Sequence, residues 1–201
     1  ARTDAEIIVS DGGSVDATAA QAVAAGAIVW TASGRGRALQ LNEGAGHAGG
    51  EILYFLHADT MPPADFLAAI QQALDAGADA GCFRLRFDDP HTLLVFSAWC
   101  TRFGTRYFRF GDQSLFVRAA LFQQIGGFRA DMPVMEDQEI VDRLRRAARF
   151  TILPQSVTTS ARRYRANGVW WLQFLFLLIV TGYGLGIPPD RLWRFYRRAI
   201  R

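Results

Sequence analysis

Cysteine is scarce in this sequence, which has only Cys82 and Cys100 among its 201 residues. Two such distant cysteines provide neither a disulfide framework nor the CxxC spacing of zinc and redox sites, so we expect buried thiols in a reducing compartment. Residues 1–16 lack the basic start and long apolar run of a signal peptide. Both absences favour a cytoplasmic location.

The sequence also lacks internal repeats, low-complexity tracts and the spacing of the common nucleic-acid-binding modules. Its net charge is +3, and much of the arginine responsible lies after residue 140. A basic C-terminal third suits phosphate groups or an anionic membrane surface, although a solvated face has the same composition. We therefore predict no nucleic-acid partner and keep a membrane surface as a candidate partner.

Short apolar runs alternate with helical patterns in the first part of the chain. Residues 6–10 and 52–56 read as buried strands, the first followed at once by Asp11 and the second closely by Asp59. The helical patterns between them predict βαβ units, and hence an α/β fold with a Rossmann-like, mostly parallel sheet and flanking helices. Ligands of such sheets bind beyond the carboxyl ends of the strands. Both acids are therefore expected at one binding edge.

Two loops carry candidate ligand-binding residues. In SDGGSVD, the Asp11 carboxylate suits hydrogen bonds from a base or ribose, and Gly12 admits close approach. The alternative is a tight turn, with Asp16 as a helix cap. In GRGR, Arg35 and Arg37 suit phosphate or base contacts, or form a solvated basic turn. The loop lacks the GK[ST] of a Walker motif.

His57 and Asp59 follow the apolar strand and are separated by one residue. On an extended segment that spacing points both side chains to one side, as metal coordination requires. A divalent ion there would neutralise a leaving diphosphate, and an imidazole beside a carboxylate favours Mn²⁺ over Mg²⁺. The alternative is a packed histidine and an aspartate that caps the turn before Pro62.

Glu136 and Asp137 stand at the start of a predicted amphipathic helix, whose last turns are rich in arginine. Complementarity with the helix dipole explains these charges without catalysis. A carboxylate in a partly desolvated cleft can instead have its pKa raised toward the value that a general base requires. One member of the pair is therefore a candidate base.

Five segments occur in the order SDGGSVD, GRGRALQLNEGA, YFLHADT, FVRAALFQQIGGF and MEDQEIVDRLRR. As an ordered set, over about residues 6–165, they resemble the family 2 glycosyltransferases. The resemblance implies a GT-A fold, a nucleotide-sugar donor, with a UDP-sugar as the first expectation, an acceptor that the sequence does not name, and Mn²⁺ or Mg²⁺ as cofactor. A non-catalytic nucleotide-binding or membrane-associated module is the main alternative. A nucleotidyltransferase would instead need a basic phosphate-binding loop near the first strand.

The resemblance also implies roles for particular residues. Asp11 is similar to the aspartate that contacts the base, Arg37 to a donor contact, and Asp59 to the last acid of the DxD signature. Asp137 resembles the catalytic base of the ED pair. His57 departs from the pattern, because it replaces the first acid of DxD and so affects which metal binds and how strongly. A small bacterial branch of the family is similar in carrying HAD.

Members of this family begin with another apolar strand and its helix, ahead of the strand at residues 6–10. We therefore expect residues 1–165 to form a GT-A-like domain whose first strand is missing. That strand would lie centrally in the sheet, so its loss would expose apolar surface and unpaired backbone groups.

Residues 166–201 are expected to form an apolar, membrane-associated helical segment. From Val169 to Ile187 no charged residue occurs, and this run is about as long as a bilayer-spanning helix needs. Gln173, Thr181 and several glycines speak against a full span, so peripheral or monotopic attachment at the inner face of the cytoplasmic membrane is favoured over it. A buried helix is the remaining alternative.

Overall fold

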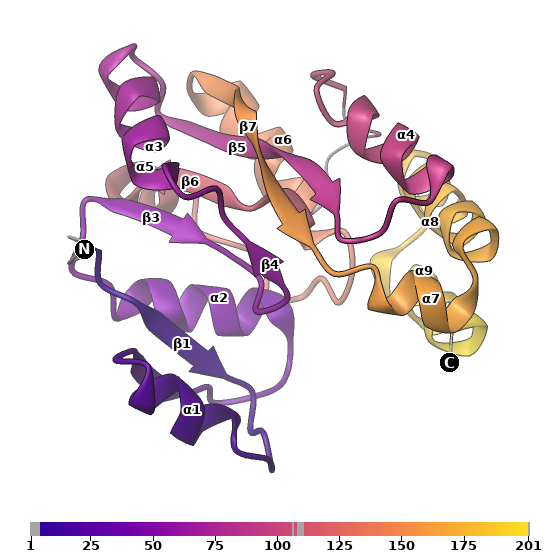
Figure 1. Ribbon diagram of the computed structural model, residues 1–201, viewed down its shortest axis with the longest axis horizontal. Coiled ribbons are helices and arrows are strands. Elements are labelled where there is room, and N and C mark those ends of the chain that lie inside the picture. Colours follow the sequence, from indigo (N-terminus) through magenta and orange to yellow (C-terminus); the bar gives the residue numbers. More distant parts are fainter. Residues whose placement is uncertain (1–4, 106, 108–110, 201) are drawn as a thin grey trace.

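The computed structural model describes residues 5–105, 107 and 111–200 (Figure 1). Its strands are β1 (Ile8–Asp11), β2 (Ile28–Thr31), β3 (Ile52–Phe55), β4 (Thr60–Met61), β5 (Ala80–Phe87), β6 (Leu115–Arg118) and β7 (Phe150–Thr159). Its helices are α1 (Thr18–Ala24), α2 (Arg37–Gly46), α3 (Phe66–Asp75), α4 (Thr92–Cys100), the 3-10 turn η2 (Gly111–Gln113), α5 (Ala119–Gln124), α6 (Glu136–Ala147), α7 (Arg162–Asn167), α8 (Val169–Gly184) and α9 (Pro189–Ala199).

The main sheet has the strand order β3-β6-β5-β7-β4. Strands β5 and β7 pair in parallel, whereas β6 and β4 pair antiparallel to their neighbours. Because β6 lies between β3 and β5 and opposes both, β3, β5 and β7 run in one direction. The predicted α/β class is confirmed. Two further strands, β4 and β6, run in the opposite direction, and the sequence patterns did not indicate this.

Strand β7 was not predicted from the sequence, and its irregular pairing gives the reason. Phe83 of β5 pairs with Leu153, but the next residue, Arg84, pairs with Ser156. Two residues of β7, Pro154 and Gln155, are therefore left over in a bulge. Proline has no N–H to donate to a ladder, and it interrupts the alternation that identifies a strand in a sequence.

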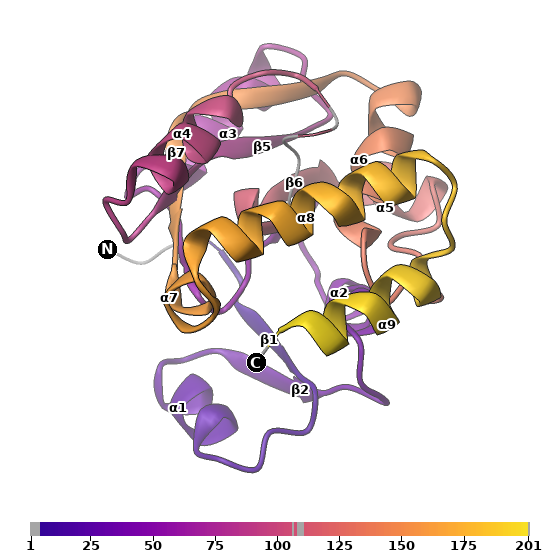
Figure 2. The same cartoon turned by 90° about the vertical axis from the view of Figure 1, so that its right-hand side faces the viewer.

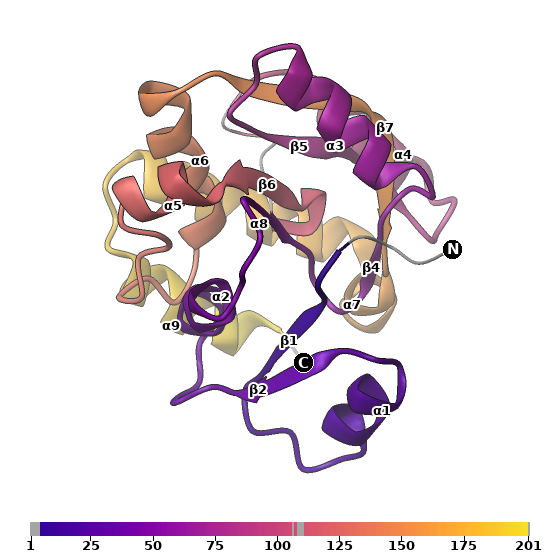
Figure 3. The ribbon, with the colours of Figure 1, turned by 90° about the vertical axis from the view of Figure 1, so that its left-hand side faces the viewer.

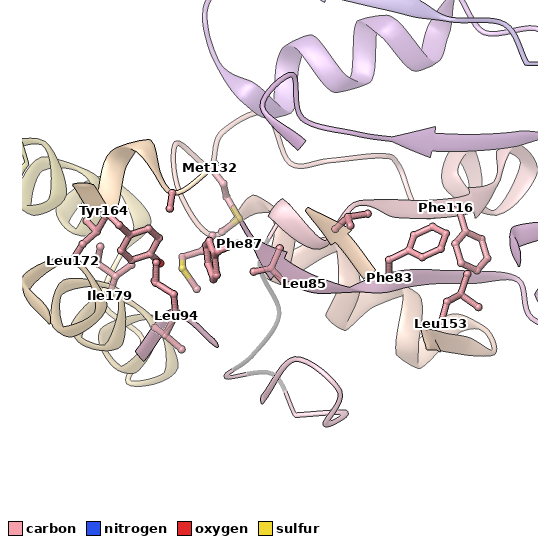
Figure 4. Packing of buried hydrophobic residues seen from close by; sticks show 14 of the residues in the cluster. Phe83, Leu85, Phe87, Leu94, Phe116, Met132, Leu153, Tyr164, Leu172 and Ile179 are labelled. Carbon is pink, nitrogen blue, oxygen red and sulfur yellow. The ribbon is translucent and has the colours of Figure 1, made fainter. Parts of the chain in front are cut away.

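Two apolar clusters cover the two faces of the sheet. One joins Phe83, Leu85 and Phe87 of β5 to α3, α4 and α8, and Figure 4 shows Phe83 near Phe116 and Leu153, and Phe87 nearer to Leu94. The other joins β3, β6 and Ala80 to α2, α5 and α6. Alternate residues of β5 thus face different helices, as the period of a strand requires.

The predicted apolar C-terminal helix is present as α8, which ends at Gly184. One side of α8 is buried through Leu172, Leu175 and Ile179, and α9 turns back alongside it (Figure 2). Across the ranges that the structure describes, no helix is both long and apolar enough to cross a membrane.

Strands β1 and β2 form a separate parallel pair, with α1 on one side and α2 on the other (Figure 3). Helix α1 has no buried residue, and Val15, Val23 and Ile28 are exposed. Within the described ranges β1 is not paired with β3. The expectation of a further strand beside β1 stays a prediction.

Candidate functional site

The site begins where β3 ends and β6 starts. Phe55 pairs with Leu115 in the antiparallel β3–β6 ladder, so the residues that follow Phe55 lie beside those that precede Leu115. The Nδ1 atom of His57 lies 3.5 Å from Oδ1 of Asp112, in η2. The topology of the sheet, rather than closeness in sequence, brings this imidazole and this carboxylate together.

A pocket at this point combines His57 with Asp137 from the start of α6. Its other lining residues are Leu41, Phe55, Cys82, Gly111, Gln113, Ser114, Leu115, Phe128, Ile140 and Val141. Two of the predicted site residues therefore share one pocket, although 80 positions separate them in the sequence. Apolar side chains form most of the wall, so a charged group that enters is partly removed from water.

Arg37 joins the acidic pair to α2. Its Nη1 atom lies 3.1 Å from Oε1 of Glu136 and 3.4 Å from Oδ2 of Asp137. Arg37 is the first residue of α2 and follows Gly36, whose φ of 140° is outside the range that residues with a side chain usually adopt. About half of the Arg37 side chain is exposed, so it can bind a further anion while it holds both acids.

The two acids of this cluster differ in their surroundings. Glu136 is only 2% exposed, and burial raises the pKa of its carboxyl; the charge of Asp137 acts in the same direction, whereas Arg37 opposes it. The Asp137 side chain is 19% exposed and lines the pocket. Asp137 is thus the member of the pair that a ligand can reach.

The His57–Asp112 pair is electrostatically matched. Burial by itself lowers the pKa of His57, but the interaction with Asp112 and the charge of Asp137 outweigh it and raise that pKa. Burial likewise raises the pKa of Asp112, but His57 and Arg37 lower it below its ordinary value. Each partner therefore favours the charged form of the other.

Gly111 allows the Asp137 carboxylate to approach the chain closely. A Cβ atom at Gly111 would lie 2.1 Å from Oδ2 of Asp137, far inside contact distance. Any side chain at position 111 would therefore move this carboxylate.

Asp59, the second predicted metal ligand, is exposed, and its backbone carbonyl accepts a hydrogen bond from the N–H of Ser160. The described part of the chain holds no group of three or more His, Cys, Asp or Glu side chains that could bind a metal. His57 and Asp59 offer one nitrogen and one carboxylate, fewer ligands than a site built from protein alone needs. A divalent cation at this pair would need further ligands from elsewhere.

Asp11 lies at the end of β1, where its own loop occupies its carboxylate. The N–H groups of Gly13 and Ser14 and the Ser14 hydroxyl donate to it, and these bonds lower the pKa of Asp11. A Cβ at Gly12 would lie 2.0 Å from Nε2 of Gln40 in α2. This geometry fits the tight-turn interpretation and leaves the predicted base contact as a proposal.

Arg35 is exposed and makes no hydrogen bond or ion pair with the rest of the described chain. Neither Arg35 nor Asp11 is among the described residues that line the pocket of His57 and Asp137. The structure thus gathers His57, Arg37, Glu136 and Asp137, whereas the other four candidates, Asp11, Gly12, Arg35 and Asp59, are not among the described residues that line this pocket.

Asp112 is the site residue that the sequence interpretation missed. It precedes a buried strand instead of following one, so a search of strand ends does not find it. The usable signal was the polar run Asp112–Ser114 directly before the apolar residues of β6. Its importance follows only once β6 is known to run antiparallel beside β3.

Comparison with known proteins agrees with this architecture. The family model described as Glycosyl transferase family 2 matches residues 1–125. The mannosyltransferase PcManGT from Pyrobaculum calidifontis, solved with GDP-Man and Mn²⁺, is similar with a TM-score of 0.66 and 22% identity, over 96% of this chain and 59% of that one. The chain thus spans about three-fifths of the length of that relative.

Two other solved structures are similar. TarS from S. aureus, in complex with UDP-GlcNAc, has a TM-score of 0.64 and 15% identity, over 88% of this chain and 57% of that one. Glucosyl-3-phosphoglycerate synthase from Mycobacterium tuberculosis, in complex with Mn²⁺, UDP and its product, has a TM-score of 0.59 and 17% identity, over 91% and 70%. The chain has no match among the curated proteins.

These structural similarities confirm the GT-A fold that the sequence motifs implied. The family model covers more than half of the sequence, and the chain belongs to glycosyl transferase family 2.

Proposed function

We propose that this chain is the catalytic part of a glycosyltransferase that moves a sugar from a nucleotide-sugar, with a UDP-sugar as the first candidate, to the hydroxyl of an acceptor. The observation that carries the proposal is the pocket in which Asp137, positioned by Arg37, faces His57. Family membership sets the reaction class, and the pocket supplies groups for its two demands: removal of a proton and stabilisation of a departing diphosphate.

In the proposed reaction, Asp137 accepts the proton of the acceptor hydroxyl. The acceptor oxygen forms a bond to the anomeric carbon, and the bond from that carbon to the diphosphate oxygen breaks. The electron pair leaves with the nucleoside diphosphate. Arg37 orients Asp137 through their ion pair, and its exposed half is available to a diphosphate oxygen. Glu136 acts as the buried anchor of Arg37.

The loop of Asp11 and Gly12 is assigned to the base and ribose of the donor, and Arg35 is assigned to the donor's phosphates. Asp11 is the last residue of β1, and ligands of such sheets bind beyond the carboxyl ends of the strands. Arg35 is an exposed guanidinium two residues before Arg37. These three assignments rest on the family motif and on position in the fold.

A divalent cation, Mn²⁺ before Mg²⁺, fits His57 and Asp59 together with the donor diphosphate. When bound, it would neutralise charge on the leaving group. A histidine that binds a metal through one nitrogen commonly donates its other ring N–H to a carboxylate, and Asp112 lies beside Nδ1. Nε2 would then be the nitrogen available to hold the cation. Mn²⁺ is present in the complexes of PcManGT and of the phosphoglycerate synthase.

Titration calorimetry with UDP tests the donor and metal assignments together. We expect UDP to bind more tightly with Mn²⁺ than with a chelator, Asp59→Ala to abolish the metal-dependent part, and His57→Ala to reduce it. Asp75→Ala, which removes an exposed acid from α3, is the control. Identical UDP affinity with Mn²⁺ and with chelator would show that the metal site is wrong.

Turnover separates the transferase from a non-catalytic nucleotide-binding module. A thermal-shift panel of UDP- and GDP-sugars identifies the donor, because a ligand that binds the folded state raises apparent stability. Release of nucleoside diphosphate from that donor, with water or a sugar as acceptor, then measures transfer. Tight binding without any release would favour the module.

We also propose that the C-terminal helices contact a membrane surface. The exposed large side chains of α8 are Trp170, Trp171, Phe174, Leu177 and Leu178. Exposed arginines flank them on α9, which suits an anionic lipid surface.

A further inference from the structure

A second concave region lies away from the pocket of His57 and Asp137, between α4 and the last halves of β5 and β7 (Figure 1). Its polar lining includes Arg84 and Arg86 from β5, Arg102 just after α4, and Ser156 and Thr158 from β7. We call it the arginine groove.

The ladder between β5 and β7 explains why these groups converge. Arg84 pairs with Ser156 and Arg86 with Thr158, so each arginine stands opposite a residue with a hydroxyl group, and all four residues line the groove. Residues 84 and 86 are two apart on the strand and therefore share a face. Guanidinium and hydroxyl groups together supply several hydrogen-bond donors in a small area, which is the chemistry that recognises an oxyanion.

The three arginines have no ion-pair partner within the described ranges. Arg102 is held from one side only: its Nε atom donates to the carbonyl of Trp99 at 3.0 Å, and its guanidinium carbon lies 4.8 Å from the centre of the Trp99 ring. The Nε atom of Arg84 is buried without a hydrogen-bond partner. An unpaired buried donor of a charged group is unfavourable, so an acceptor atom from a ligand would stabilise Arg84.

Two acids also line the groove, but other groups already hold them. Arg165 Nη1 lies 3.2 Å from Asp88 and 3.3 Å from Asp89. The N–H of Ala161 donates to Asp88 and the N–H of His91 donates to Asp89. Arg165 balances one of these two negative charges, and the three arginines of the groove outnumber the one that is left.

The groove adjoins the candidate active site along β5. Cys82, which lines the pocket of His57 and Asp137, is two residues before Arg84 on the same strand. That separation corresponds to about 7 Å. An acceptor with its phosphate in the groove and its hydroxyl at Asp137 would therefore lie along this part of β5.

We propose that the arginine groove binds a phosphate monoester, and that this phosphate belongs to the sugar acceptor. The second half of the proposal rests on the proposed transferase function; the first half does not. The groove then acts as a specificity site that selects anionic acceptors, while the pocket of Asp137 performs transfer.

Binding of inorganic phosphate tests the site without any need for turnover. We expect phosphate to bind the whole chain, as measured by phosphorus NMR line broadening, and Arg86→Gln and Arg84→Gln each to weaken binding about tenfold or more. Arg146→Gln removes the same charge from an exposed position on α6 and should leave phosphate affinity unchanged. Arg86 is exposed, so its substitution keeps the test valid even where Arg84→Gln fails to fold.

Competition locates the phosphate. Saturating UDP with Mn²⁺ should leave phosphate bound if it lies in the groove; displacement by UDP, or affinity that survives both substitutions, overturns the proposal. Vesicles that contain phosphatidic acid, compared with pure phosphatidylcholine vesicles, show whether a lipid carries the phosphate. Binding to phosphatidic acid vesicles that depends on Arg86 supports a lipid. If only the binding of inorganic phosphate depends on Arg86, the source is a soluble molecule.

The two proposals can fail separately. Loss of UDP binding with intact, Arg86-dependent phosphate binding would contradict the transferase and retain the groove. In the opposite case, normal UDP binding and release with no Arg86-dependent phosphate binding would retain the transferase and reject the groove.

Discussion

Glu136 and Asp137 are adjacent in the sequence and carry the same functional group, but they lie in different surroundings. Glu136 is buried and has a raised pKa, whereas Asp137 opens on the pocket. Arg37 forms an ion pair with both carboxylates and so links them to each other. A base must be reachable by the proton that it removes, and this criterion of geometry selects Asp137.

We expect Asp137→Asn to lower the rate of transfer about a hundredfold to ten-thousandfold and to leave donor affinity nearly unchanged, because the variant keeps its size and loses only proton acceptance. Nucleoside diphosphate release and calorimetry measure the two quantities. Glu136→Gln is the control and should lose far less rate. Near-normal turnover in Asp137→Asn, together with loss in Glu136→Gln, would identify Glu136 as the base.

Gly111→Ala should reduce turnover strongly while the protein still folds. The new Cβ would overlap Oδ2 of Asp137 and displace the carboxylate, whereas Gly111 is not among the residues with positive φ and tolerates alanine in its backbone. Gly46→Ala in α2 is the matched control, since a Cβ there meets no atom within 4 Å. A Gly111→Ala variant with unchanged rate would show that the position of Asp137 is not critical.

Much of the site at this scale could be predicted from the sequence, because His57, Arg37, Glu136 and Asp137 stand in motifs at the ends of recognisable elements. The contacts among them could not. The ion pair of Arg37 with Glu136 spans 99 positions, and the His57–Asp112 contact depends on an antiparallel neighbour strand. The periodicity of apolar residues indicates local structure only, so neither contact can be predicted from it.

Helix α6 places the acids of its first turn in different surroundings. Its first turn carries Glu136, Asp137 and Glu139, where the helix dipole favours negative charge. Glu139 is satisfied by Arg143, with Nη2 to Oε2 at 2.6 Å. Glu136 is instead buried, and burial raises the pKa of its carboxyl although Arg37 opposes this.

This arrangement predicts a pH-dependent contribution to stability. Because the pKa of Glu136 is raised in the folded state, the unfolded chain releases this proton first as pH rises above the ordinary value of about 4.3. Glu136 therefore stabilises the fold most below that value, and its contribution is lost as pH rises through the folded pKa. Glu136→Gln cannot titrate and lacks this loss.

Urea unfolding from pH 4 to pH 8 measures the effect. We expect the free energy of unfolding of the wild type, relative to Glu136→Gln, to be highest near pH 4 and to fall toward neutral pH. The sign is fixed by the direction of the shift. Parallel curves for the two proteins across this range would contradict a raised pKa for Glu136.

Elements with clear periodicity were predicted, and those without it were not. The strands at β3, β5 and β6 and the helices α3 and α6 follow regular apolar patterns. Helix α4 has apolar residues all round, TLLVFSAWC, so its sequence gives no direction for a buried face. Strand β7 contains Pro154 in its bulge. Tertiary packing determines both of these elements.

At the scale of the whole molecule, the N-terminal and C-terminal parts present different surfaces. The β1–β2 pair and α1 expose apolar side chains that include Val23, Ile28 and Trp30. On the other side, α8 exposes a row of aromatic and leucine side chains, and Trp170 contacts His91 at the start of α4. Exposed Phe96 and Trp99 of α4 extend this apolar surface. Contiguous apolar surface of this kind marks an interaction site.

The whole chain should therefore bind vesicles, and anionic ones more strongly than neutral ones, because exposed arginines of α9 flank the apolar row. Sedimentation with phosphatidylglycerol and phosphatidylcholine vesicles measures the preference. Replacing Trp170, Phe174 and Leu177 together by serine removes three exposed side chains, which are 72%, 51% and 60% accessible, and should abolish sedimentation without loss of fold.

Val15→Ser with Val23→Ser is the matched control, since it removes exposed apolar groups from the opposite part of the molecule and should leave vesicle binding unchanged. High salt should weaken the preference for anionic vesicles, because it screens the arginines, and leave the apolar contribution in place. A wild-type chain that stays in the supernatant with both vesicle types would show that another partner, or none, covers α8. The role of α8 would then be to pack against the core through Leu172, Leu175 and Ile179.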